Sequence, residues 1–300
     1  MYRLLVFDID GTLLSDDRSL PQAVAHALAA ARSHGFGVTL ATGRELSEAE
    51  PVIRQVRPNA PVVGCNGALV YDPNTRRILW EAPISRGTAL RLAGRLDELG
   101  WHYGVCGRDR IVVGRRHAWR LRLGPWRRLR NWTGLVYYVR WLWEWRRYVN
   151  LEVVPDVSRF LDTWDEPVMN FFVWEPAESV VRHLGPLAKE VSVDPVSPRS
   201  VHIMAPGVDK GTGVEVLAGL LGIGMDGVVV CGDQYNDLSM LRRAGLAVAV
   251  GNAPPEVQRQ AAWVVPSNRE NGAALLIHRL IRMTARSAEP AAADRSGAAD

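Results

Sequence analysis

The sequence predicts an α/β fold in which a doubly wound parallel sheet carries helices on both faces and the chain is interrupted by a long insert. Short apolar runs alternate with amphipathic segments along 1–80 and 197–282, as expected of parallel strands joined by crossover helices. The intervening residues, 81–196, differ in composition. With 300 residues, 47% of them apolar, the chain is long enough for two cores of modest size.

Each element of the sheet is predicted from an apolar run bounded by turn residues. In the first part we expect strands 3–7, 37–41 and 61–65, helices 20–34 and 45–56, and a hairpin over 68–80. After the insert we expect helices 212–221, 237–244, 254–260 and 271–283, and strands 227–231, 246–250 and 262–265. The tail, 283–300, is rich in alanine and polar residues and is predicted to be disordered.

The first strand runs directly into two aspartates, in the order Asp8-Ile9-Asp10-Gly11-Thr12. Parallel strands carry their chemistry at the carboxyl edge of the sheet. Two carboxylates two residues apart in an extended chain point the same way. Such a pair suits a carboxylate nucleophile beside a carboxylic acid, with a divalent cation to offset the charge. The alternative is an Asp-Gly turn with solvated carboxylates.

The second strand also ends in small polar residues, Thr42-Gly43-Arg44. The Thr42 hydroxyl and the Gly43 amide can each donate a hydrogen bond to a phosphoryl oxygen. The N-terminus of the following helix can face the same anion. The alternative is that Thr42 is an ordinary helix N-cap.

A lone lysine precedes the helix that follows the insert. The chain has 34 arginines and only two lysines, Lys189 and Lys210. Retention of Lys210 in Gly207-Val208-Asp209-Lys210-Gly211 suggests that a compact ammonium is needed there. The alternative is a solvated loop lysine.

The strand 227–231 ends in the segment Gly232-Asp233-Gln234-Tyr235-Asn236-Asp237. Hard oxygen ligands of this kind suit Mg²⁺, which binds few protein carboxylates and keeps several waters. An Asn-Asp helix cap would explain Asp237 but leaves Asp233 without a role.

In this order, the four segments resemble the haloacid dehalogenase superfamily of phosphotransferases. Asn66-Gly67-Ala68, Pro206–Gly211 and Asn268–Ala273 narrow the resemblance to the Cof-like branch with a type IIB cap. The resemblance implies a Rossmann-like catalytic core, residues 1–80 and 197–282, and a smaller, inserted α/β cap domain, residues 81–196.

The resemblance also implies roles for individual residues. Asp8 would attack phosphorus and form an aspartyl-phosphate, while Asp10 would protonate the leaving oxygen and then activate water. The cofactor would be Mg²⁺, held by the Asp8 carboxylate, the Asp10 carbonyl and Asp233, with Asp237 holding a metal-bound water. Phosphate would be bound by Thr42, Gly43 and Lys210. Further candidates for substrate contact are Arg44, Asn66 and Asn236, whereas His102, His117 and His202 are expected to be structural.

The insert contains a basic, aromatic stretch, Arg115–Tyr148, with ten arginines, one glutamate and six tryptophans. Its net charge is about +9 from 10 − 1, whereas the whole chain carries +4. Its tryptophans can pack on a cap sheet while its arginines face water, or the stretch can select a larger anionic substrate. Two further interpretations of this stretch are weak contact with anionic membranes and weak contact with nucleic acid.

The function predicted from these motifs is a Mg²⁺-dependent phosphatase acting on a small phosphorylated metabolite. The alternatives are a phosphomutase, or a basic membrane or nucleic-acid binding protein with a relic core. Intact Asp8, Asp10, Lys210 and Asp233 argue against a relic. No transmembrane segment or secretory leader is expected. Three widely spaced cysteines suggest free thiols and a cytoplasmic location, while the oligomeric state cannot be read.

Overall fold

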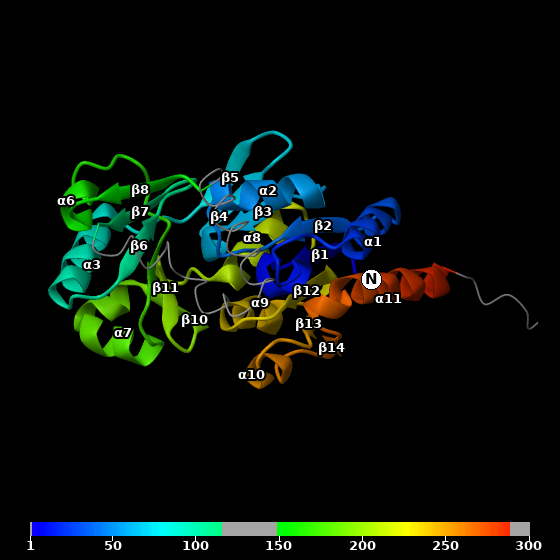
Figure 1. Ribbon diagram of the computed structural model, residues 1–300. Helices are drawn as coiled ribbons and strands as arrows, with labels where there is room; N and C mark the ends of the chain where they lie inside the picture. The colour runs from blue at the N-terminus through cyan, green and yellow to red at the C-terminus, as the bar shows by residue number, and fades with distance from the viewer. Residues whose placement is uncertain (1, 116–148, 289–300) are drawn as a thin grey trace, which may run out of the picture.

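The computed structural model describes residues 2–115 and 149–288, which form two α/β bodies joined side by side (Figure 1). One contains a five-stranded parallel sheet and the other a six-stranded mixed sheet. We call them the core and the cap. The predicted fold class, a doubly wound parallel sheet with an inserted α/β body, is confirmed.

The core sheet has the strand order β14-β13-β12-β1-β2 and is parallel throughout. Its strands are β1 (Leu4–Phe7), β2 (Gly37–Leu40), β12 (Val228–Gly232), β13 (Leu246–Val250) and β14 (Trp263–Val265). Most of these strands are buried on both faces, which explains their continuous apolar runs. The strand β3 (Val62–Gly64) continues the sheet through a parallel bridge beside β2 and forms an antiparallel sheet with β4 (Leu69–Asp72) and β5 (Arg77–Glu81).

Alternate residues of the core strands pack on helices of opposite faces. On β1, Leu5 and Phe7 face one helical layer, and Leu4 and Val6 face the other. The first layer contains α1 (Gln22–Ser33), α2 (Leu46–Val56) and α11 (Gly272–Ala288). The second contains α8 (Lys210–Leu220), α9 (Leu238–Arg243) and α10 (Pro255–Gln258). Since β1 lies between β12 and β2, its carboxyl end is central to the sheet edge.

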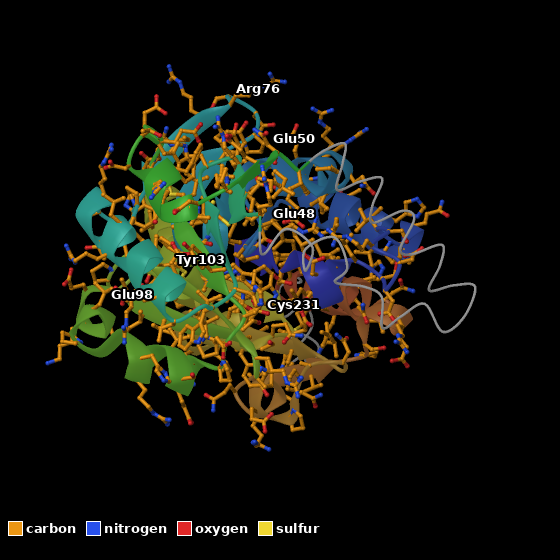
Figure 2. All side chains as sticks on the ribbon, turned by 60° about the vertical axis from the view of Figure 1, so that its left-hand side comes forward. Glu48, Glu50, Arg76, Glu98, Tyr103 and Cys231 are labelled. Carbon is orange, nitrogen blue, oxygen red and sulfur yellow. The ribbon has the colours of Figure 1, made fainter. Side chains whose placement is uncertain are left out.

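The cap sheet has the strand order β10-β11-β9-β6-β7-β8. Its strands are β6 (Tyr103–Cys106), β7 (Ile111–Gly114), β8 (Leu151–Val154), β9 (Asn170–Val173), β10 (Ser192–Ser197) and β11 (Ser200–Met204). The helices α3 (Arg86–Glu98), α6 (Val157–Leu161) and α7 (Ala177–Leu184) pack on one face of this sheet, where Tyr103 is buried. Figure 2 labels Tyr103 in the cap and Cys231 in the core. The other face of the sheet is turned toward the core.

The structure corrects two boundaries. The second part of the core was expected to begin at residue 197, but β11 pairs with β9 and β10 and belongs to the cap sheet. The chain therefore returns to the core between β11 and α8. The tail was expected to be disordered from residue 283, yet α11 continues to Ala288, because Met283, Ala285 and Arg286 have high helix propensity.

Some expectations concern residues beyond these ranges. Apart from Arg115, the basic stretch lies outside the described residues, as does 289–300, so its four readings stay predictions. Among the helices that are described, none has both the length and the low polarity needed to cross a bilayer. The cysteines are free and buried, as expected: Cys65, Cys106 and Cys231.

Candidate active site

A cavity of about 360 Å³ lies between the carboxyl edge of the core sheet and the inner face of the cap. The core lines it with residues from the ends of its strands and the loops that follow: Asp8, Asp10, Thr42, Gly43, Arg44, Glu45, Glu48, Gln234 and Asn236. The cap lines it with Gly104, Cys106, Ile111, Phe172, Trp174, Val196 and His202. Most of the residues predicted as site residues therefore line this cavity.

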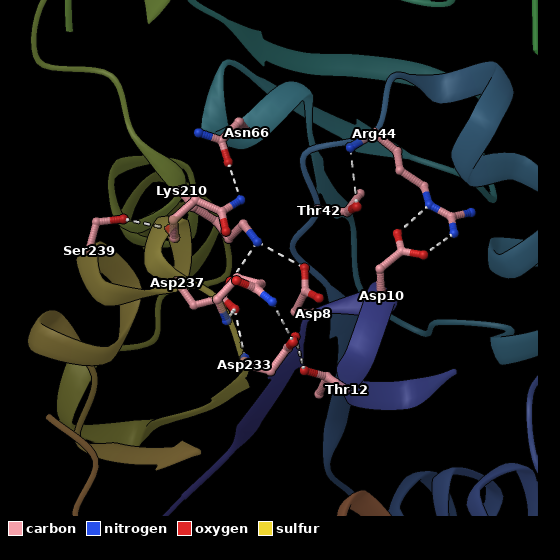
Figure 3. Close-up of polar contacts among 12 residues, drawn as sticks. Asp8, Asp10, Thr12, Thr42, Arg44, Asn66, Lys210, Asp233, Asp237 and Ser239 are labelled. Atoms are coloured by element: carbon pink, nitrogen blue, oxygen red, sulfur yellow. Dashed lines mark hydrogen bonds and ion pairs between the residues drawn. The ribbon is translucent and has the colours of Figure 1, made fainter. Parts of the chain in front are cut away.

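Asp8 is buried and held by Lys210. Its backbone N–H donates to the Cys231 carbonyl at 2.9 Å, which extends the parallel ladder to the strand tip. Lys210 Nζ donates to Asp8 Oδ1 at 2.8 Å and to Asp237 Oδ1 at 2.5 Å (Figure 3). Lys210 is only 1% exposed, so the solvated-loop alternative is excluded.

The ionisation of Asp8 and Lys210 is coupled. Burial raises the pKa of Asp8 to about 7, although the Lys210 ammonium opposes this rise. Burial alone would lower the pKa of Lys210, but the carboxylates of Asp237 and Asp8 raise it above its ordinary value. Lys210 is therefore a permanently charged group beside the carboxylate at the strand tip.

Two glycines permit the close approach of the loops. Gly67 has φ +100°, and a Cβ on it would collide with the backbone carbonyl of Asp209, which is the residue before Lys210. Gly11 has φ +83°, and a Cβ on it would collide with the Asp233 carboxylate. Glycine adopts a positive φ readily and has no Cβ to collide with the neighbouring loop, so both glycines help to assemble the site.

A second pair of carboxylates lies beside Asp8. Asp233 Oδ1 accepts a hydrogen bond from Thr12 Oγ1 at 3.0 Å, and Asp237 Oδ2 accepts from the backbone N–H groups of Asp233 and Gln234 at 2.8 and 2.9 Å. Oxygens of Asp8, Asp233 and Asp237 lie within 4.8 Å of one another. Burial and the neighbouring carboxylates raise the pKa of Asp233 to about 9.

This carboxylate cluster fits a hard divalent cation. Its available ligand atoms are carboxylate oxygens, which Mg²⁺ prefers. Burial, and next to it the charge of the neighbouring carboxylates, raises the pKa of Asp8 and of Asp233, and a bound cation would favour their ionised forms. Asp237 accepts three hydrogen bonds, one from Lys210 and two from backbone N–H groups. Asp233 accepts two from side chains and Asp8 accepts one from Lys210, so these two carboxylates are less engaged and are the better candidate ligands.

Asp10 has a different partner from Asp8. It lies in the turn Ile9–Leu13, and its carboxylate accepts two hydrogen bonds from the Arg44 guanidinium, at 2.7 and 2.6 Å (Figure 3). Burial would raise the pKa of Asp10, but Arg44 lowers it to about 2. The side chain of Asp10 is half exposed to the cavity, so solvent weakens this pair. Arg44, expected to contact substrate, is thus engaged with Asp10.

Thr42 is buried after β2 and is free to donate a hydrogen bond. Its Oγ1 accepts from the Arg44 backbone N–H at 3.2 Å, and its hydroxyl hydrogen has no acceptor in the part of the chain that the structure describes. The N-cap of α2 is Glu45, whose carboxylate accepts from the N–H groups of Ser47 and Glu48. Thr42 is therefore not the helix cap. The expectation that this helix N-terminus faces phosphate is also wrong, because the Glu45 carboxylate occupies it.

Asn66 and Asn236 join the core to the cap. Asn236 Nδ2 donates to Asn66 Oδ1 at 2.8 Å, and Asn66 Nδ2 donates to Asp194 Oδ2 of β10 at 2.7 Å. Asn236 lines the cavity, whereas Asn66 is fully buried outside its lining. The structure therefore gives Asn66 a place in the core–cap contact, away from the cavity surface.

Sequence reasoning missed the cap residues of the cavity, above all His202. This histidine was expected to be structural, yet it lines the cavity from β11. The signal was the alternation on that strand, where Val201 and Ile203 enter the cap core and His202 faces the other way. Burial and the charge of Lys210 lower the pKa of His202 to about 3, so the ring is neutral at pH 7.

Comparisons with known proteins agree with this geometry. A family model described as haloacid dehalogenase-like hydrolase matches residues 5–277. Pyridoxal phosphate phosphatase YbhA of Escherichia coli (strain K12) is 30% identical over 284 residues, which cover 92% of this chain and 97% of that protein.

Solved structures show the same fold. A haloacid dehalogenase-like hydrolase from B. subtilis aligns with a TM-score of 0.82 at 22% identity, covering 93% of this chain and 99% of that one. The haloacid dehalogenase subclass IIB sugar phosphatase BT4131 aligns with a TM-score of 0.74 at 22% identity, covering 93% and 98% of the two chains.

Proposed function

The chain belongs to the haloacid dehalogenase-like hydrolases, in the Cof-like branch, and is a phosphatase, and we propose that it hydrolyses small phosphate monoesters through a phosphorylated Asp8. The observation that carries this proposal is the position of Asp8. It stands at the tip of an interior strand, at the edge of a cavity, with Lys210 and two further carboxylates beside it.

The first chemical step transfers the phosphoryl group to the protein. A carboxylate oxygen of Asp8 bonds to phosphorus as the ester P–O bond breaks, and the leaving oxygen takes a proton from Asp10. The Thr42 hydroxyl, the Gly43 amide and the Lys210 ammonium would neutralise charge on the phosphoryl oxygens. In the second step water attacks phosphorus, gives its proton to Asp10 and releases phosphate and Asp8.

Asp10 must carry a proton in the first step, yet its pairing with Arg44 favours the ionised carboxylate. The pair must therefore loosen when substrate enters, so that Asp10 can turn from Arg44 toward the leaving oxygen. Because Asp10 is half exposed to the cavity, this movement is not blocked by packing.

The residues that would hold Mg²⁺ are Asp8, Asp233, the Asp10 carbonyl and, through a water, Asp237. When bound, the ion would offset the negative charge that the phosphoryl group brings to the carboxylate cluster. Without a cation, burial and mutual repulsion favour protonation of Asp8 and Asp233, which would remove the nucleophile.

A phosphatase fits the cavity better than a phosphomutase. A mutase that uses a bisphosphate must hold a second phosphate beyond the reacting one. All the charged side chains among the described lining residues come from the core, and the cap part of the lining has none. A membrane or nucleic-acid role has no support in the described residues. We retain the cytoplasmic location, in keeping with the three free cysteines.

The experiment is a phosphate-release screen with Mg²⁺ or with a chelator. We expect turnover only with Mg²⁺ and without a bisphosphate activator. Asp233→Asn, which removes one charge from the cluster, should raise the Mg²⁺ concentration needed for half-maximal activity at least tenfold. The matched control, Asp162→Asn, changes an aspartate that is 74% exposed and should leave this concentration unchanged. Full activity in chelator would refute the proposal.

A further inference from the structure

Three aromatic rings form a corner on the inner face of the cap. Phe172 and Trp174 have ring centroids 4.7 Å apart at 84°, and Phe172 and His202 have centroids 5.2 Å apart at 75°. His202 of β11 pairs directly with Phe172 of β9 in the sheet, so the register fixes this contact. We call these three residues the aromatic corner.

The aromatic corner faces the cavity and is incompletely covered. Phe172 and Trp174 are half-buried, although both belong to the sheet face opposite the cap core. The rest of the described cap lining is uncharged, from Gly104, Cys106, Ile111 and Val196. Because neighbouring rings of the corner are nearly perpendicular, a bound ring can contact the face of one and the edge of another. This arrangement suits a flat aromatic ring better than a saturated chain.

His202 adds one polar group to this apolar wall. Its side chain is 8% exposed, and its Nδ1 has no hydrogen-bond partner among the described residues. Nδ1 has almost no accessible surface in this conformation, so a ligand pairs with it only if the imidazole turns toward the cavity. A buried polar atom without a partner is unfavourable, so a ligand that pairs with it in this way gains affinity. Because the ring is neutral, it suits an uncharged polar group better than an anionic one.

The aromatic corner lies next to the place where phosphate is expected. His202 Cε1 would be 3.0 Å from a Cβ built on Gly43, and Gly43 is a candidate phosphate ligand. A ring seated in the corner can therefore be joined to the ester oxygen only by a short linker. The cavity of about 360 Å³ has room for a phosphoryl group and one ring, since a cavity of about 150 Å³ holds benzene.

We propose that the aromatic corner binds the leaving group of the substrate, and that this group is a single planar aromatic or heteroaromatic ring on a short linker, with a polar substituent that hydrogen bonds to His202. This inference rests on the proposed phosphatase function. A sugar is the main competitor, but its several hydroxyls would find one polar side-chain partner, His202, on the described cap wall.

The first test compares kcat/KM for three phosphate esters, pyridoxal 5′-phosphate, benzyl phosphate and glucose 6-phosphate, and for one acyl phosphate without a ring, acetyl phosphate. We expect the wild type to prefer the two ring esters to the sugar phosphate by at least about tenfold, the effect of one good aromatic contact. Trp174→Leu should lower the ratio of ring ester to acetyl phosphate by about tenfold, mainly through KM. Trp101→Leu, which removes a half-buried cap tryptophan outside the cavity, should leave this ratio unchanged.

The second test concerns the hydrogen bond. His202→Leu should reduce the preference for pyridoxal 5′-phosphate over benzyl phosphate about tenfold, as expected for one buried hydrogen bond. His202→Asn, which returns an amide near the position of Nδ1, should restore part of that preference. Equal loss on both esters in His202→Leu would overturn the role of His202 as a hydrogen-bonding group.

A binding measurement separates this inference from the proposed function. If none of the four compounds is hydrolysed with Mg²⁺, the phosphatase proposal fails, yet pyridoxal 5′-phosphate binding to Asp8→Asn can still be measured by calorimetry. We expect the further change Trp174→Leu to weaken that binding about tenfold. Turnover of glucose 6-phosphate above that of both ring esters, or binding unaffected by Trp174→Leu, would overturn the assignment of the aromatic corner.

Discussion

Replacing Lys210 with methionine should destabilise the metal-free protein by about 3–5 kcal/mol, because the change leaves buried carboxylates without their cation. At an effective dielectric constant of about 20, the contacts of 2.8 and 2.5 Å each correspond to about 6 kcal/mol of attraction. The desolvation of a buried ammonium costs several kcal/mol and offsets part of the attraction to the two carboxylates. Methionine has a similar length and fills the space, so a packing defect contributes little.

Magnesium should reverse part of this loss. A ligand at about 100 times its Kd stabilises the folded state by about 2.7 kcal/mol. Because Lys210→Met leaves Asp8 and Asp237 with more uncompensated charge, Mg²⁺ should raise its free energy of unfolding more than that of the wild type.

The assay is urea unfolding at pH 8, in chelator and in Mg²⁺. The matched control is Lys189→Met, which removes the other lysine of the chain, an exposed residue, and should change stability by less than about 0.5 kcal/mol. The reasoning is refuted if Lys210→Met in chelator stays within about 0.5 kcal/mol of the wild type, or if Mg²⁺ stabilises both proteins equally.

Three further predictions concern two residues that line the cavity, Asp10 and His202, and the loop contact of Gly67 with Asp209. Asp10→Asn should slow single-turnover phosphorylation of the enzyme by an alkyl phosphate about 10²–10⁴-fold. Phosphorylation by nitrophenyl phosphate, whose leaving group needs no acid, should slow much less. Rapid-quench rates that fall equally for both substrates would contradict the role of Asp10 as the acid. The pKa of His202 falls from 6.5 to about 3 on folding, so its neutral form stabilises the fold above pH 6.5 and this contribution is lost as pH falls. Between pH 7 and 5, wild type should lose about 2 kcal/mol more than His202→Phe in urea unfolding; parallel curves would exclude the burial effect. Gly67→Ala should cost about 1–3 kcal/mol through its positive φ and the collision with Asp209; an unchanged unfolding midpoint would show that the loop can shift.

Local sequence patterns were sufficient to predict the core and the groups at its edge. An apolar run followed by Asp8, Thr42 or Asp233 marks the end of a parallel strand, and parallel strands bring such residues to one edge. The rarity of lysine also pointed to Lys210, which proved to be buried between carboxylates.

Contacts between the core and the cap could not be read in this way. The pairing of Arg44 with Asp10 joins two loops, and that of Asn66 with Asp194 depends on how the cap docks. His202 faces the cavity only because β11 belongs to the cap sheet. The strand follows β10 after a short turn without a change in composition, so no local signal placed the boundary beyond it.

The central claim is that Asp8 carries the phosphoryl group during turnover. The most direct measurement is acid quenching of the enzyme during hydrolysis of a phosphate ester with Mg²⁺, followed by mass mapping of the tryptic peptide 4–18. We predict one phosphoryl group on Asp8 in the wild type and none in Asp8→Asn. A phosphoryl group on another residue, or turnover by Asp8→Asn at a rate near that of the wild type, would contradict the account.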